Sequence, residues 1–258
     1  MSCPEPALSQ DAFWRGAFHL VQPRKGAYRS GMDALLVASG VAADASGHAL
    51  DMGAGAGAIG FAAAARAPAL RVVLAEKTAE MASCARAGLA LGENRGLAGR
   101  ISIIEADLLA PRAAREAAGL SDGSFDHVLS NPPFYPHGHR ASPAPLRREA
   151  LSMPDDAFLA RWLHVASALS RHGASFLCIV APACLPSLMS AMDGRFGAVG
   201  LLPVHARAGR PATRLLVAAR RGSRAPLRML PALTLADADG AATEQADMLS
   251  DGTLHLDL

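Results

Sequence analysis

The most unusual short stretch of the sequence is residues 130–135, which read SNPPFY and directly follow the apolar run FDHVL. Two consecutive prolines cannot continue a strand, because neither ring nitrogen carries a hydrogen for the ladder. Asn131 supplies an amide carbonyl that accepts hydrogen bonds, and Phe134 and Tyr135 supply aromatic faces. The stretch is either an ordinary strand-ending turn or a fixed set of polar and stacking groups at a ligand site.

A second candidate site is the glycine-rich stretch ALDMGAGAGAIG at residues 49–60. It reads as an apolar strand, a glycine turn and an immediate helix. Gly53, Gly55 and Gly57 allow positive φ angles and bring the backbone close to a ligand at the helix N-terminus. This stretch therefore predicts a ligand-binding turn.

The same letters satisfy the dinucleotide fingerprint G-x-G-x-x-G, through Gly55, Gly57 and Gly60. Glu76 lies at about the distance along the chain at which that fingerprint places its acidic residue. A nicotinamide or flavin dinucleotide is therefore an alternative ligand for the turn, and an oxidoreductase the matching alternative function.

Three carboxylates argue for a different ligand. Asp51, Glu76 and Asp107 follow three successive apolar runs. Together they suit a cationic amino acid group, ribose hydroxyls and an adenine amine, all of which S-adenosylmethionine carries. The pyrophosphate of a dinucleotide would be repelled by such a cluster at short range. The sequence thus favours S-adenosylmethionine as the cofactor.

The elements that must position these residues alternate along the chain. Short apolar runs predict buried parallel strands, and amphipathic or alanine-rich segments between them predict helices. This order predicts an α/β fold, a doubly wound, mostly parallel, seven-stranded Rossmann-like sheet, with the ligand beyond the carboxyl ends of the strands. The expected strands are 48–52, 71–75, 101–105, 125–129, 174–180, 198–205 and 213–219, and the expected helices are 57–67, 78–91, 154–170 and a short one after Pro182.

Composition narrows the class of protein. The chain has 258 residues, 51% of them hydrophobic, enough for one large domain with appendages. We expect an N-terminal segment or lid at 1–30, a catalytic domain at 31–220 and a C-terminal extension at 221–258. No apolar run is long enough to span a bilayer, and the start does not read as a signal peptide. The four cysteines lack metal-type spacing, and we expect no metal, a cytoplasmic location and no obligate protein partner.

With these residues placed, the chain resembles the class I S-adenosylmethionine-dependent methyltransferases, in particular those that methylate amines and carry an Asn-Pro-Pro-aromatic motif. LDMGAGAGAIG matches the first motif of that family, and NPPF, residues 131–134, matches its catalytic motif. The resemblance implies that Glu76 binds the ribose and Asp107 the adenine. The stretches 26–40 and 227–252 further resemble the bacterial tRNA(Val) adenine-N6 methyltransferases, which modify the adenine beside the anticodon.

The motif has a physical role in this chemistry. An exocyclic aromatic amine is a poor nucleophile, because its lone pair is delocalised into the ring. The Asn131 side-chain carbonyl can accept one N–H of the amine, and the Pro132 backbone carbonyl, held in direction by Pro133, can accept the other. Both acceptors gain as positive charge develops on the nitrogen. Phe134 and Tyr135 can stack on the base.

Basic residues point to RNA as the substrate. Between residues 137 and 148 lie three arginines, Arg140, Arg147 and Arg148, and no acid. We expect these arginines to contact phosphates beside the target base. A second strip, between residues 195 and 228, contains eight arginines and no acid, with Arg207, Arg210 and Arg214 as the candidates.

The resemblance also implies that the N-terminal segment folds over the cofactor. Tyr28, Arg29 and Asp33 would then lie near its methionine end, although Asp33 equally suits a helix cap. The Phe and Trp of the helix expected at 154–170 are assigned to the core.

Enzymes that methylate other amine substrates carry the same Asn-Pro-Pro-aromatic motif. We rank guanine N2 in rRNA second and the N5 of a protein glutamine third, because glutamine enzymes favour Tyr directly after Pro-Pro whereas this chain has Phe134. The non-enzymatic alternative is a module that binds S-adenosylmethionine and docks RNA without chemistry. The intact residues Asn131, Pro132 and Pro133 argue against it.

Overall fold

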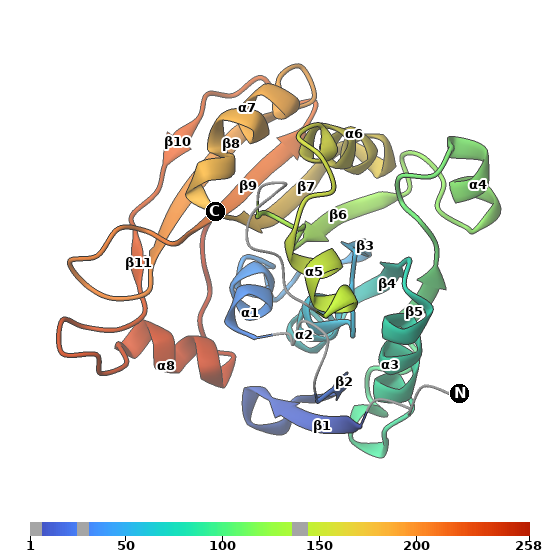
Figure 1. The fold of residues 1–258 in the computed structure, drawn as a ribbon, viewed down its shortest axis with the longest axis horizontal. Helices are drawn as coiled ribbons and strands as arrows, with labels where there is room; N and C mark the ends of the chain where they lie inside the picture. The colour runs from blue at the N-terminus through green and yellow to red at the C-terminus, as the bar shows by residue number, and fades with distance from the viewer. Residues whose placement is uncertain (1–6, 25–30, 136–143) are drawn as a thin grey trace.

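The computed structural model describes residues 7–24, 31–135 and 144–258, and for Pro145, Arg147 and Glu149 it describes the backbone alone. Its centre is a nine-stranded sheet in the order β10-β8-β9-β7-β6-β3-β4-β5, with β11 also paired to β8 (Figure 1). The strands are β3 Gly47–Met52, β4 Leu70–Glu76, β5 Ile101–Glu105, β6 Phe125–Ser130, β7 Ser170–Val180, β8 Phe196–His205, β9 Arg214–Arg221, β10 Arg228–Met229 and β11 Leu233–Thr234.

The predicted doubly wound, mostly parallel sheet is confirmed. Its seven long strands are the seven predicted ones, and β9 alone among them runs antiparallel to its neighbours. Two-residue strands β10 and β11 were not predicted, since two residues give no periodicity. The strand order reverses between β3 and β6, and this switch point is where such sheets bind ligands.

Helices cover both faces of the sheet. They are α1 Met32–Ser39, α2 Ala58–Arg66, α3 Ala79–Leu89, α4 Arg112–Ala117, α5 Pro145–Leu151, α6 Phe158–Leu169, α7 Leu185–Met192 and α8 Glu244–Asp251. Buried residues of α1 and α2 share one core cluster, and those of α6 and α7 share the other. Among the described residues no helix is long and apolar enough to cross a membrane.

Strand residues alternate between these two clusters. Ala49 of β3 packs in the cluster that includes α1 and α2, whereas Leu50 and Met52 pack in the one that includes α6 and α7. This is the period-two alternation of a pleated strand. Asp51 has the same parity as Ala49, and its carboxylate accordingly accepts a hydrogen bond of 2.9 Å from the Gly60 N–H of α2.

The N-terminal hairpin and helix α8 meet on the side of α1 and α2. A hairpin of β1 Leu8–Phe13 and β2 Phe18–Pro23, which was not predicted, contacts α2 and α3 (Figure 1). The Trp14 indole N–H between these strands donates to the Leu249 carbonyl of α8 at 3.0 Å. The lid over the cofactor was predicted on residues 1–30, of which 7–24 form this hairpin and its two ends, 1–6 and 25–30, lie outside the described residues.

Candidate active site

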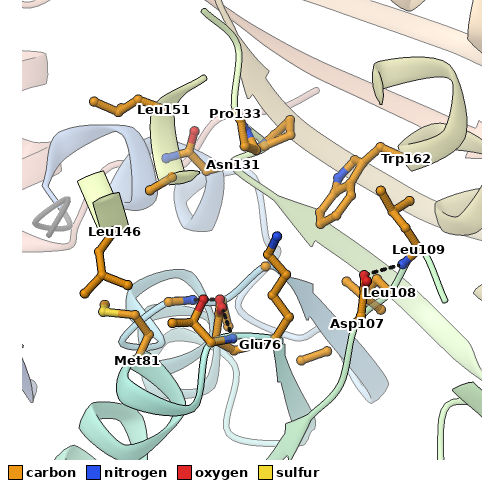
Figure 2. Close-up of a pocket in the computed structure, with 18 of the residues that line it drawn as sticks. Glu76, Met81, Asp107, Leu108, Leu109, Asn131, Pro133, Leu146, Leu151 and Trp162 are labelled. Carbon is orange, nitrogen blue, oxygen red and sulfur yellow. Dashed lines mark hydrogen bonds between the residues drawn. The ribbon is translucent and has the colours of Figure 1, made fainter. Parts of the chain in front are cut away.

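A cavity of about 690 Å³ opens at the carboxyl edge of the sheet. Its walls are the segments that follow β3, β4, β5 and β6, together with Ala34 of α1, α5 and the residues after it, and Phe158 and Trp162 of α6. Figure 2 shows Asn131 and Pro133 on one side of this space and Glu76 and Met81 on the other. The strand ends that carry the predicted motifs therefore surround one cavity.

The glycine turn forms the floor of this cavity. Gly53 and Gly55, with φ angles of 69° and 57°, line the space and present backbone without side chains. Gly57, with a φ of 92°, begins α2 and does not line it. A Cβ atom at Gly57 would lie 2.7 Å from Leu74 and 2.9 Å from Phe61. Gly57 was predicted to bind the cofactor, but the structure places it in the close packing of α2 on the sheet.

Asp51 was also predicted to contact the cofactor, and the structure corrects its placement. Its side chain is fully buried, it faces α2, and it does not line the cavity. Burial raises the pKa of Asp51 to about 7, with the nearby charge of Glu76 as a smaller contribution and the Gly60 hydrogen bond opposing both. The side chain of a strand residue faces only one side of the sheet. Asp51 therefore supports the glycine turn from the α2 side and does not reach the cavity.

Glu76 lines the cavity at the end of β4. Its two carboxylate oxygens accept the backbone N–H groups of Gly55 and Thr78, each at 2.8 Å. These bonds fix the carboxylate against the glycine turn and leave further acceptor positions on both oxygens. The arrangement suits a pair of ribose hydroxyls.

Asp107, after β5, lies on the side of the cavity next to Leu109 (Figure 2). Its side chain is exposed, and one carboxylate oxygen accepts the Leu109 N–H at 2.8 Å. The other oxygen has no partner among the described residues and can accept from an amine. Two carboxylates, Glu76 and Asp107, thus lie at separate positions along one cavity. A ligand that carries ribose hydroxyls and an amine at separate positions would fit this arrangement.

The Asn-Pro-Pro-Phe turn begins where β6 ends. Asn131 lines the cavity, and its side-chain carbonyl oxygen is buried and lacks a hydrogen-bond partner among the described residues. An unmet buried acceptor is costly in a folded protein, so this oxygen is suited to a donor from a ligand. Leu151 of α5 stands beside Asn131 in Figure 2.

The chain after this turn is held firmly. Cys184 donates its thiol hydrogen to the Phe134 carbonyl at 3.4 Å. The Tyr135 N–H donates to the Leu151 carbonyl, and the Met153 N–H donates to the Tyr135 carbonyl, both at 2.9 Å. These bonds tie α5 to the end of the motif, so α5 and the turn form one wall of the cavity.

Two aromatic residues assigned to the core also line the cavity. Phe158 and Trp162 stack with ring centroids 5.4 Å apart and belong to the buried cluster on that face. The Trp162 indole N–H donates at 3.0 Å to the Ser130 hydroxyl, directly before the motif. This role was missed from the sequence, and the only signal for it was that a buried indole needs a polar partner.

Comparison with known proteins identifies the fold family. A family model described as "Methyltransferase small domain" matches residues 30–146. The crystal structure of a predicted O-methyltransferase, protein Atu636 from Agrobacterium tumefaciens, is 35% identical, with a TM-score of 0.74, and the match covers 87% of this chain and 98% of that one. The chain belongs to the S-adenosylmethionine-dependent methyltransferases.

Two curated relatives of this methyltransferase match over shorter stretches. Release factor glutamine methyltransferase from Chlorobaculum tepidum is 36% identical over 107 residues, which are 42% of this chain and 34% of that protein. Ribosomal RNA small subunit methyltransferase C from Klebsiella pneumoniae subsp. pneumoniae is 33% identical over 138 residues, 51% of this chain and 36% of that protein. The methyltransferase thus spans about a third of the length of each.

The cofactor of this methyltransferase is S-adenosylmethionine, and the residues present fit it. Gly53 and Gly55 would give the cofactor a cradle free of side chains, and Glu76 and Asp107 would offer carboxylates to its ribose and its adenine amine. When bound, the cofactor supplies an electrophilic methyl group on a sulfonium. Among the described residues there is no group of three or more His, Cys, Asp or Glu side chains that could hold a metal ion.

The remaining predicted site residues of the methyltransferase fall into three groups. Arg148 is exposed on α5 and lines the cavity, whereas Tyr135 is half-buried and does not line it. Asp33 does not line the cavity and instead pairs with Arg214 at 3.0 Å. The residues whose placement lies outside the described part of the structure are Tyr28, Arg29, Arg140 and the side chain of Arg147.

Proposed function

We propose that this protein transfers the methyl group of S-adenosylmethionine to the exocyclic N6 amine of an adenine, in the anticodon loop of a tRNA. The observation that carries the proposal is the Asn131 carbonyl oxygen, which is buried and unpartnered among the described residues and belongs to a side chain that lines the cofactor cavity. A primary amine has two N–H donors, and the turn supplies two acceptors, this oxygen and the Pro132 carbonyl.

The turn favours transfer through electrostatic preorganisation. The Pro132 carbonyl is fixed before the reaction by two proline rings, and the chain after it is fixed by the bonds of Phe134 and Tyr135. As the amine nitrogen takes the methyl group, positive charge develops on it and the two oxygens stabilise that charge. One N–H proton leaves the nitrogen afterwards, so no general base with a shifted pKa is required.

Stacking of the target base is more restricted than the sequence suggested. Phe134 borders the cavity, but only 4% of its surface is exposed and the Arg214 guanidinium covers one ring face. A base can therefore meet only the other face of Phe134, and half-buried Tyr135 is the second stacking candidate. A base flips into such a pocket at least cost from a single-stranded loop, which agrees with an anticodon loop as the substrate.

Two relatives favour other acceptors for the same chemistry. Guanine N2 in rRNA is the second candidate, supported by the ribosomal RNA relative, and a protein glutamine is the third, supported by the release factor relative. Both are NH2 groups and use the two acceptors equally well. The Agrobacterium protein is described as a predicted O-methyltransferase. A hydroxyl has a single hydrogen to donate, so it would leave one acceptor of the turn unused.

One experiment separates these acceptors. The protein is incubated with labelled S-adenosylmethionine and, in turn, with total tRNA, ribosomal subunits and release factors, each from cells that lack the gene. Label in N6-methyladenosine from tRNA supports the proposal, label in N2-methylguanosine supports the second candidate, and label in protein alone shows that the substrate class is wrong.

The same assay tests the role of Asn131. Asn131→Ala should lower the rate of transfer roughly a hundred- to a thousandfold, the usual cost of removing one preorganised polar contact. Its affinity for S-adenosylhomocysteine, measured by calorimetry, should stay unchanged. Gln245→Ala, which removes an exposed amide of α8, is the matched control and should keep wild-type turnover. Near-normal turnover of Asn131→Ala would remove Asn131 from the mechanism.

A further inference from the structure

Arg214, the first residue of β9, lies over the Phe134 ring of the motif, with its guanidinium carbon 4.7 Å from the ring centroid. Its Nε donates to an Asp33 carboxylate oxygen at 3.0 Å, and one terminal nitrogen donates to the Thr213 carbonyl at 2.9 Å. The Arg214 and Asp33 side chains are 26% and 13% exposed. The guanidinium is therefore held on two sides in a partly buried position.

Three segments that are distant in sequence meet at this contact. Asp33 lies in the first turn of α1, next to Ala34, which lines the cofactor cavity. Phe134 follows β6, and Arg214 is brought to the same edge because β9 runs antiparallel to the other long strands. The contact thus links α1, which borders the cofactor cavity, to the Asn-Pro-Pro-Phe turn, which is proposed to bind the substrate amine.

The chemistry of the contact is specific to arginine. A planar guanidinium can lie flat over an aromatic ring and at the same time direct several N–H groups sideways at fixed angles. A lysine ammonium would keep the charge beside Asp33 but would lose the flat stacking. An exposed cation–π contact is weak, but partial burial and the charged hydrogen bond to Asp33 both strengthen this one.

We infer that Arg214, oriented by Asp33, is a positioning residue that holds Phe134 and thereby fixes the direction of the Asn131 and Pro132 acceptors. The inference rests on the proposed function for its effect on turnover. Arg214 itself does not line the cavity, so it acts through Phe134. Asp33, predicted to bind the cofactor, orients the arginine.

Kinetics test this role first, with the acceptor that the labelling experiment identifies. Arg214→Ala should lower kcat about tenfold, the effect of losing roughly 1.4 kcal/mol of cation–π and ion-pair positioning. The KM for the acceptor and the Kd for S-adenosylhomocysteine should stay within about twofold of wild type. Arg214→Lys should keep the melting temperature but recover little of kcat, and Asp33→Asn should lower kcat without changing the cofactor Kd.

The matched control is Arg220→Ala, which removes an exposed arginine from the far end of the same strand. It should leave kcat unchanged. Two results would overturn the inference: wild-type kcat in both Arg214→Lys and Asp33→Asn, or a change in Arg214→Ala confined to KM and dependent on salt. The second result would make Arg214 a direct contact to the substrate.

A spectroscopic measurement needs no acceptor and so separates this inference from the proposed function. With 4-fluorophenylalanine in place of Phe134, the fluorine NMR resonance of the cofactor-bound protein should shift and broaden in Arg214→Ala and in Arg214→Lys, but not in Arg220→Ala. If the resonance responds while adenine gains no label, the positioning role stands and the acceptor is wrong. An unchanged resonance in Arg214→Ala would show that Arg214 does not hold Phe134.

Discussion

Asp51 and Glu76 are buried carboxylates with opposite surroundings at the glycine turn. Both oxygens of Glu76 accept backbone N–H groups at the cavity wall. Asp51 has one oxygen bonded to the Gly60 N–H, while the other is buried without a partner among the described residues. A charge at Asp51 is therefore poorly stabilised, which is the physical cause of its raised pKa.

This environment predicts a pH-dependent stability. The pKa of Asp51 rises from 3.8 to about 7 in the folded protein. Between these values the native state holds a proton that the unfolded chain has lost, so this group makes stability fall as pH rises from about 4 to 7. Asp51→Asn keeps an acceptor for Gly60 and does not titrate. Its free energy of unfolding relative to wild type should increase from pH 5 to pH 8 by at most about 2.7 kcal/mol, because the native state keeps its proton over about two pH units of that range.

Urea denaturation of the cofactor-free protein at the two pH values measures this difference. Asp44→Asn, which changes an exposed carboxylate, is the control and should show a much smaller change. A difference between Asp51→Asn and wild type that is the same at both pH values would show that Asp51 is ionised throughout this range.

At the scale of elements, α5 determines access to the cavity. It begins with Pro145, is tied through Leu151 and Met153 to the backbone of Tyr135, and places Leu146 opposite Met81 in Figure 2. Leu146 and Leu151 both line the cavity. The helix therefore forms a wall of the space between the cofactor cradle and the Asn-Pro-Pro-Phe turn.

Leu146→Ala tests whether this wall covers a bound cofactor. Alanine preserves the helix, since its helix propensity is at least that of leucine, but it removes apolar contact over the cavity. Release of S-adenosylhomocysteine should become faster, with up to about tenfold loss of affinity from the smaller buried apolar area. Stopped-flow displacement measures the release rate.

Leu227→Ala is the control for this variant, because Leu227 is 44% exposed and does not line the cavity. It should release the ligand at the wild-type rate. Equal release rates in Leu146→Ala and wild type would mean that α5 does not cover the bound cofactor.

At the scale of the whole molecule, strand β9 separates the arginine-rich stretch 195–228 into two groups. Because β9 runs antiparallel to its neighbours, one group lies at the carboxyl ends of the parallel strands and the other at their amino ends. Arg207 and Arg210 follow the carboxyl end of β8 and lie at the edge that carries the cavity. Arg220 and Arg224 lie at the opposite end of β9. All four side chains are exposed, so the two pairs differ in position while their charge is equal.

RNA binding should distinguish these two pairs. The double variant Arg207→Ala/Arg210→Ala should bind the substrate RNA more weakly, and the slope of log affinity against log salt should fall by about one for each phosphate that the variant no longer binds. The double variant Arg220→Ala/Arg224→Ala carries the same net charge and should bind as wild type does. Equal weakening in both variants would mean that overall charge, and not the edge beside the cavity, attracts the RNA.

Local sequence patterns predicted the seven long strands and much of the cavity, but gave no bounds for the β1–β2 hairpin or for helices α1, α4, α5 and α8. Apolar runs and their spacing predicted the seven long strands, with β5 at its observed bounds. Because parallel strands bring their carboxyl ends to one edge, the residues after those runs, Glu76, Asp107 and Asn131, were predicted to meet, and they line one cavity.

Contacts between distant segments were decided by tertiary structure alone. The pairing of Asp33 with Arg214 joins residues 181 positions apart, and the cavity-lining role of Trp162 depends on how α6 packs on the sheet. Asp51 shows the same limit within one strand. The sequence places it at the end of β3, but it does not tell which helices cover each face of the sheet. The structure shows that Asp51 faces α2 and not the ligand cavity. Periodicity describes one element at a time, whereas the packing between elements decides what each side chain contacts.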